Sequence, residues 1–215
     1  MAQELKTDLV SPANGSSSLP RMTFEEFLEW CDEKTFAEWV DGEVILMSPV
    51  SLEHQDLAAF LAALLRHFAE ANNSGLVLTA PFLMKLAVRP SGREPDVMFI
   101  ARERLGDLKN VYLDGPADLA IEVISPESRT RDRKDKYYEY QQAGVREYWW
   151  FDPIRREVEF YRLNDEGLYR AVPVGDDDIF RSAVLEGLWL KVNWLWQEPL
   201  PRLMSILKEW GLVKE

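Results

Sequence analysis

Two acidic residues of the chain stand in surroundings that suit metal chemistry. Glu122 lies within 119–124, a run that is otherwise apolar, and a carboxylate in a buried strand is costly unless a cation or hydrogen bonds compensate it. Asp96 follows Pro95 at the start of another candidate strand. Alone, Glu122 would fit a structural ion pair equally well and Asp96 would fit a turn. Together, on neighbouring strands, they offer the oxygen ligands that a hard cation such as Mg²⁺ prefers, which favours a metal site.

A lysine further along the chain could assist such a site. Asp132, Lys136 and Tyr140 are spaced by four, so they share one face of a helix. If that face packs against the Glu122 strand, the Lys136 ammonium could lower the pKa of an attacking water or neutralise charge on a phosphate. The alternative is a solvated Asp132–Lys136 pair, which is common on helices. The spacing by itself favours this alternative.

The elements that must position these residues follow from periodicity and turn signals. A capping pattern predicts a helix from Thr23, and Asp41-Gly42 predicts a hairpin. Other helices are expected over 51–72, 130–142 and 201–212, and other strands over 76–80, 82–88, 96–100, 119–124, 145–151, 157–163, 168–172 and 183–192, the last three as a meander. We predict a disordered arm over residues 1–20 and a single α/β domain with a mixed sheet over 21–215.

Composition limits the possible classes of protein. The chain has 215 residues, enough for one substantial core. It has no apolar run of the ~18 residues that a membrane span needs and no signal-peptide pattern, so no membrane association is expected. With the single cysteine Cys31 no intrachain disulfide can form, which points to a reducing cytoplasm.

The net charge of −12 argues against a protein that coats DNA passively, because such proteins neutralise phosphates with Lys and Arg. It argues less against a nuclease, since bound cations reverse the local field. Arg129, Arg131 and Arg133 adjoin the proposed site and could hold phosphates, although a solvated basic face is the ordinary role of such a cluster.

Several motifs occur in a defined order along residues 22–165. They are Asp41-Gly42-Glu43-Val44-x₂-Met47-Ser48-Pro49 with His54, Glu94-Pro95-Asp96-Val97, Ile121-Glu122-Val123-Ile124-Ser125-Pro126, Asp132-x₃-Lys136-x₃-Tyr140, Ala143-Gly144-Val145-x-Glu147-Tyr148-Trp149 and Asp152-Pro153. In this order they resemble the Uma-two family of restriction endonucleases, within the PD-(D/E)XK nuclease superfamily. Each motif alone would be weak.

The resemblance implies a restriction-endonuclease-like mixed sheet flanked by helices, with Asp96 and Glu122 as the two acids of the motif. The usual lysine position is occupied by Ile124, which cannot act. The lysine of this family is displaced to the following helix, so the resemblance indicates Lys136, with Lys134 the less favoured neighbour.

The same resemblance implies roles for two residues near the hairpin. Glu43 would be a further acid near the metal or a second metal, and His54 would contact phosphate or steady Glu43. The alternatives are a strand residue that faces solvent for Glu43 and a simple helix-start residue for His54.

The hypothesis is therefore a metal-dependent endonuclease that hydrolyses DNA, with Mg²⁺ or Mn²⁺ held by Asp96, Glu122 and Glu43 and with Lys136 assisting. Such enzymes often act as dimers, so a homodimer is possible. The main alternative is a non-catalytic protein that keeps the nuclease fold to bind nucleic acid or a protein partner, which Ile124 supports. A metal-dependent hydrolase acting on something other than DNA is the third possibility.

Overall fold

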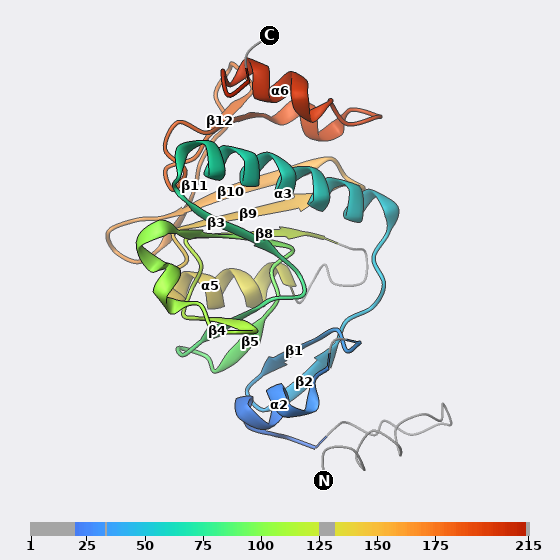
Figure 1. Ribbon diagram of the computed structural model, residues 1–215, viewed down its shortest axis with the longest axis vertical. Coiled ribbons are helices and arrows are strands. Elements are labelled where there is room, and N and C mark those ends of the chain that lie inside the picture. Colours follow the sequence, from blue (N-terminus) through green and yellow to red (C-terminus); the bar gives the residue numbers. More distant parts are fainter. Residues whose placement is uncertain (1–19, 33, 125–131, 214–215) are drawn as a thin grey trace.

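The computed structural model describes residues 20–32, 34–124 and 132–213 (Figure 1). Its strands form three sheets. The largest contains, in spatial order, β11 (Tyr169–Ala171), β10 (Glu157–Leu163), β9 (Glu147–Asp152), β8 (Leu119–Val123), β6 (Val97–Ala101) and β3 (Gly75–Thr79). The second contains β2 (Glu43–Leu46), β1 (Ala37–Val40), β5 (Ser91–Arg93), β4 (Leu83–Leu86) and β7 (Tyr112–Asp114), and the third pairs β12 (Ile179–Arg181) with β13 (Trp189–Lys191).

The predicted helices form close to their expected bounds. They are α2 (Phe24–Trp30), α3 (Leu52–Asn72), α5 (Tyr137–Ala143) and α6 (Leu203–Glu209). The structure also has a π-helical segment, η2 (Asp132–Lys136), and the 3₁₀ helices η1 (Arg102–Asp107) and η3 (Val192–Trp196). The capping box predicted for α2 is present, with Thr23 and Glu26 satisfying each other's backbone N–H groups. The predicted α/β class, a mixed sheet flanked by helices, is confirmed.

Strand β8 lies in the middle of the six-stranded sheet, as its apolar sequence predicted. It pairs antiparallel with β6 and parallel with β9, and all its residues are buried. A parallel pair needs a long crossover connection, and the chain between β8 and β9 contains η2 and α5. In the described residues, the next element after the strand that carries Glu122 is therefore η2, which carries Lys136.

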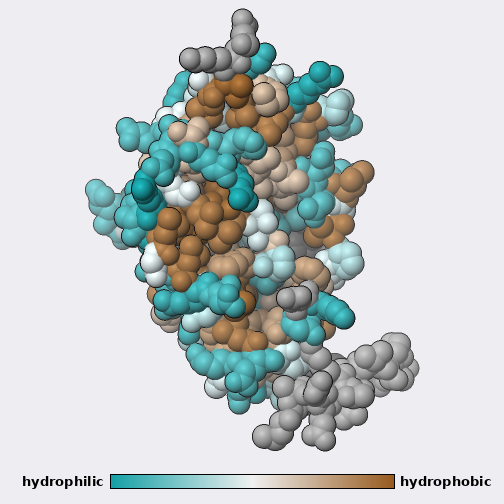
Figure 2. All heavy atoms as spheres, in the orientation of Figure 1, coloured by the Kyte–Doolittle hydropathy of each residue, from teal (hydrophilic) through white to brown (hydrophobic). Residues whose placement is uncertain are grey.

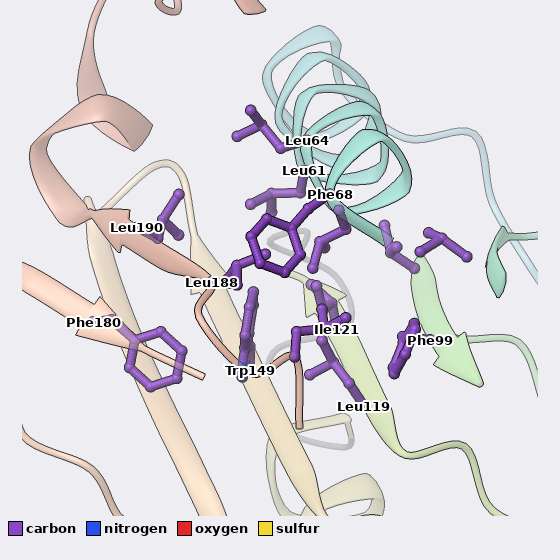
Figure 3. Packing of buried hydrophobic residues seen from close by; sticks show 14 of the residues in the cluster. Leu61, Leu64, Phe68, Phe99, Leu119, Ile121, Trp149, Phe180, Leu188 and Leu190 are labelled. Carbon is purple, nitrogen blue, oxygen red and sulfur yellow. The ribbon is translucent and has the colours of Figure 1, made fainter. Parts of the chain in front are cut away.

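Helices cover both faces of this sheet. On one face α3 lies between the sheet and α6 (Figure 1), and its apolar side packs on β8 and β9. Figure 3 shows Leu61 and Phe68 of α3 beside Ile121 and Trp149, all within one buried cluster. Close packing of such large side chains fixes the position of α3 over the strands. On the other face lie α5 and the five-stranded sheet (Figure 1).

The two large sheets are joined by a three-residue link, Glu94 to Asp96. Arg93 ends β5 in the five-stranded sheet, and Val97 begins β6 in the six-stranded sheet. In the five-stranded sheet Trp39 pairs with Gly92, so Glu38 of β1 lies opposite Arg93. The link thus brings residues of the hairpin close to the central strands of the other sheet.

Some elements differ from the prediction. The stretch 183–192 does not continue the meander: only 189–191 is a strand, and it pairs with 179–181 in a separate two-stranded sheet. Between them Ser182 Oγ accepts hydrogen bonds from Val184 N and Leu185 N, which fold the chain into a turn. The strands β5 and β7 were not predicted, and the proposed arm lies outside the described residues up to residue 19.

On the face shown in Figure 2, hydrophobic residues gather in areas bordered by hydrophilic ones. None of the helices in the described part of the chain is long and apolar enough to cross a membrane.

Candidate active site

The Glu122 carboxylate contacts two side chains of the following helical segment. Lys136 Nζ donates a hydrogen bond to Oε2 at 2.9 Å, and Tyr140 Oη donates one to Oε1 at 2.7 Å. Burial, and then the charges of Glu122 and Glu38, raise the pKa of Tyr140 well above its usual value, so its hydroxyl remains a donor. The helix face that carries Lys136 and Tyr140 therefore packs against the Glu122 strand.

Asp96 lies beside Glu122. Val97 of β6 pairs with Ile121 of β8, so residues 96 and 122 are neighbours across the two strands. Asp96 Oδ2 accepts a hydrogen bond from Val123 N at 2.7 Å. The structure thus brings together the two acids that the sequence singled out, at one end of the central strands.

His54 contacts Asp96 rather than Glu43. It stands in the first turn of α3, whose N-cap Ser51 accepts a hydrogen bond from His54 N. Its Nε2 lies 3.3 Å from Asp96 Oδ2, and the side chain is buried. The other ring nitrogen, Nδ1, has no hydrogen-bond partner among the described residues. His54 can therefore hold Asp96 in place, and a contact with phosphate stays a prediction.

Lys136 has a second acidic partner, which comes from the hairpin. Its Nζ lies 2.9 Å from Glu38 Oε1 on β1 as well as 2.9 Å from Glu122. Arg93 then contacts Glu38 Oε2 at 2.8 Å and Glu139 Oε2 at 2.6 Å. Since all these side chains are buried, this is a continuous ionic network between the two sheets and α5.

The network sets the charge of its members. Burial would raise the pKa of Glu38, but the Lys136 ammonium and the Arg93 guanidinium outweigh it and lower that pKa to about 2. For Glu94, burial and then the Glu38 carboxylate outweigh the opposing Lys136 charge and raise the pKa to about 7. With a pKa of about 2, Glu38 is an anion throughout the physiological pH range.

The described part of the cluster has more acids than cations. The acids are Glu38, Glu94, Asp96, Glu122 and Glu139, and the cations are Arg93 and Lys136. Among the described residues no group of three or more His, Cys, Asp or Glu side chains could hold a metal ion. Mg²⁺, however, is commonly held by one or two carboxylates, with water and substrate phosphate completing its coordination. Asp96 and Glu122 fit that requirement, and a divalent cation would offset the excess negative charge.

Glu43 is not brought to this group. It pairs with Val40 beside the hairpin turn, is exposed, and its Oε1 contacts Arg21 at 2.6 Å. The acid that the hairpin supplies to the cluster is Glu38, five residues earlier. The resemblance implied that Glu43 lies near the metal, whereas the hairpin residue that joins the cluster is Glu38 on β1, opposite Arg93 of β5.

The remaining predicted residues lie elsewhere or outside the description. Ile124 is buried in the apolar cluster that also contains Tyr140, and Lys134 is exposed. Arg129 and Arg131 are outside the described residues, and of Arg133 only the backbone, within η2, is described. Their contact with phosphate stays a prediction.

Sequence reasoning did not single out Glu38, Arg93 or Glu139. Glu38 had the same signal as Glu122, an acid within a buried strand. It stands next to Trp39 in β1, and all residues of β1 and of β8 are buried. Arg93 carried none, since Pro90-Ser91-Gly92 is typical of a turn and conceals the short strand β5.

Comparisons with known proteins identify the family and the fold. Residues 24–193 match the sequence profile of the Uma2 family, described as "Putative restriction endonuclease", and a search of curated proteins found no match. A solved structure described as a putative nuclease belonging to DUF820 from Anabaena variabilis ATCC 29413 superposes with a TM-score of 0.68. The likeness covers 81% of this chain and 97% of that chain at 16% identity, so it shows a shared fold. Because the profile spans most of the chain, the protein belongs to the Uma2 family of restriction-endonuclease-like proteins.

Proposed function

We propose that the protein is an endonuclease that hydrolyses DNA phosphodiester bonds and uses Mg²⁺ or Mn²⁺ held by Asp96 and Glu122. The observation that carries the proposal is the placement of these two carboxylates side by side with the Lys136 ammonium 2.9 Å from Glu122. Membership in a family described as restriction endonucleases supports DNA as the substrate. When bound, a divalent cation would activate water and stabilise negative charge on the phosphate.

The protein's own residues would orient these groups. Val123 N and His54 hold the Asp96 carboxylate, and Tyr140 holds one oxygen of Glu122. Lys136 would place a positive charge where the pentavalent phosphate gains negative charge, which is the kind of fixed electrostatic stabilisation that lowers a barrier most. Its burial restricts the motion of the side chain, so the ammonium would already be in place when the substrate binds.

The test is cleavage of supercoiled plasmid with Mg²⁺, with Mn²⁺ and with EDTA. Nicking is expected with either cation and not with EDTA. In Asp96→Asn and Glu122→Gln the rate is expected to fall by about a hundredfold or more. Glu70→Gln, which removes an exposed acid paired with Arg66 on α3, is the matched control and should cut like the wild type. A linear product that appears together with the nicked one would indicate two copies acting in concert.

Full cleavage by Glu122→Gln would contradict the proposal. The second candidate, a non-catalytic protein that binds nucleic acid or a partner, is favoured by one observation: the position of the usual lysine is occupied by Ile124, which is buried in the core. If the wild type cuts no DNA under any of these conditions and calorimetry detects no Mn²⁺ binding, this second function takes the place of the first.

A further inference from the structure

The Lys136 ammonium is shared between two carboxylates that come from different sheets. Glu122 belongs to β8 of the six-stranded sheet, and Glu38 belongs to β1 of the five-stranded sheet. Both contacts are 2.9 Å, and the lysine side chain is 2% exposed. An ammonium buried to this degree stays charged only where acids compensate it, so each contact matters for its position.

Under the proposed function, the Glu122 carboxylate would interact with two cations. A divalent cation would bind its carboxylate, which already accepts a hydrogen bond from Lys136 Nζ. A lysine with Glu122 as its one partner would compete with the cation for the same oxygens, because both are positive and both need a buried anion. A second anion for the lysine removes that competition.

We propose that Glu38 is a positioning residue: it retains the Lys136 ammonium while Glu122 binds a divalent cation, and so keeps the lysine beside the reacting phosphate without blocking the cation. The inference rests on the proposed function. Glu38 does not touch substrate or cation in this role and acts through Lys136.

Glu38 is held firmly enough for this role. Its Oε2 accepts a hydrogen bond from Arg93 Nη1 at 2.8 Å, and its Oε1 accepts one from Glu94 N at 3.2 Å. Arg93 is in turn fixed by Glu139 of α5, through contacts of 2.6 to 3.2 Å. The carboxylate therefore presents Oε1 to the lysine in one orientation, and its low pKa keeps it charged.

The inference is tested by Mn²⁺ binding to the full chain, followed by isothermal titration calorimetry. In Glu38→Gln the lysine loses one of the two carboxylates that it contacts among the described residues and keeps Glu122, so the dissociation constant for Mn²⁺ is expected to rise about tenfold, as for other residues that support metal ligands. Glu25→Gln is the matched control. It also removes a carboxylate from a lysine pair in the same layer of the molecule, the exposed contact with Lys85, and should bind Mn²⁺ like the wild type.

A double-mutant cycle separates a role through Lys136 from a plain loss of charge. Lys136→Met removes the ammonium at nearly constant length. In that background Glu38→Gln is expected to change Mn²⁺ affinity less than about twofold, since no lysine is left to compete. An equal loss of affinity in both backgrounds would overturn the inference, because Glu38 would then act as a charge alone, and so would unchanged affinity in Glu38→Gln itself.

Folding of the variants is checked by circular dichroism and thermal melting. If Glu38→Gln does not fold, Glu38→Asp serves in its place: it keeps an anion beside Arg93 but is one methylene too short to hold both cations. The same loss of Mn²⁺ affinity is expected, and affinity equal to the wild type would overturn the inference. Absence of Mn²⁺ binding by the wild-type protein is a distinct result, which would overturn the metal mechanism together with this inference.

Discussion

Lys136 has both a proposed catalytic role and a structural one. Its ammonium is buried and compensated by Glu38 and Glu122, so removing it takes a cationic partner from two buried carboxylates. Breaking a buried pair by deleting one partner commonly destabilises a protein by about 3–5 kcal/mol. A catalytic defect at this position must therefore be measured on protein shown to be folded.

For Lys136→Met we expect the rate of plasmid nicking to fall by about 10²–10³, because the fixed positive charge near the phosphate is lost. Single-turnover assays at saturating Mn²⁺ measure the effect. Lys134→Met is the comparison, since Lys134 is its exposed neighbour on the same segment. Equal losses in both variants, or none in Lys136→Met, would contradict the assigned role.

Acid should weaken the fold through Glu38. The folded-state pKa of about 2 lies below the ordinary value of 4.5, so the ionised carboxylate stabilises the protein fully above pH 4.5, and this contribution is lost as the pH falls toward 2. The shift corresponds to about 3 kcal/mol. Denaturant unfolding from pH 2 to 6 should show a shallower pH dependence for Glu38→Gln than for the wild type. Glu70→Gln should keep the wild-type slope, and a Glu38→Gln curve parallel to the wild type would refute this origin of acid sensitivity.

Single residues could be predicted where the surrounding sequence made them anomalous. Glu122 interrupts an apolar strand, and such an interruption requires a physical explanation wherever the strand is placed. The side chains that compensate it were harder to find. Lys136 was indicated by the family motifs, because helix spacing alone favoured a solvated pair with Asp132. Glu38 and Arg93 reach the site through pairing between distant strands, which no local pattern encodes.

At the scale of elements, the approach of β3 to β6 depends on Gly75. A Cβ at this position would lie 2.1 Å from the carbonyl oxygen of Ile100 and 2.7 Å from the Phe99 ring. These are backbone and core atoms that cannot move freely, so the strands would have to separate.

Gly75→Ala is therefore expected to destabilise the protein by about 1–3 kcal/mol, measured by urea unfolding. Gly106→Ala is the matched control: its Cβ would meet nothing within 4 Å, so stability should stay the same or rise slightly. Equal stability of the two variants would show that β3 has room to shift away from β6.

Elements with a strong local sequence signal were predictable, and strands that lack one were missed. The periodicity of α3 and the turn at Asp41-Gly42 specify structure locally, because each depends on residues a few positions apart. Strands β5 and β7 have three residues each, and they are ordered by their neighbours in the five-stranded sheet. The division into two large sheets depends on those short strands. The sequence therefore indicated the fold class but not the boundary between the two sheets, where the site lies.

At the scale of the whole molecule, the net charge of −12 opposes the approach of DNA. Affinity for DNA should then depend on cations held at the acidic cluster more than on the protein's own basic residues. Ca²⁺, another hard cation with oxygen ligands, provides a way to measure binding apart from the Mg²⁺ and Mn²⁺ reactions.

We expect Ca²⁺ to raise the affinity for a duplex oligonucleotide by about tenfold or more over EDTA, measured by fluorescence anisotropy at fixed ionic strength. The gain should disappear in Glu122→Gln and persist in Glu70→Gln. A wild-type affinity that is equal with Ca²⁺ and with EDTA would mean that basic residues, not bound cations, attract the DNA.

The link from Glu94 to Asp96 has a consequence for how the length of this chain can vary among relatives. Its two ends are fixed in different sheets, with Arg93 in one ionic network and Asp96 beside Glu122, so one inserted or deleted residue would move an acid out of the site. The exposed turn at 165–167 joins two strands of one sheet and carries no such restraint. Relatives that keep the proposed activity should therefore differ in length at turns of the second kind and keep the spacing from Arg93 to Asp96 unchanged.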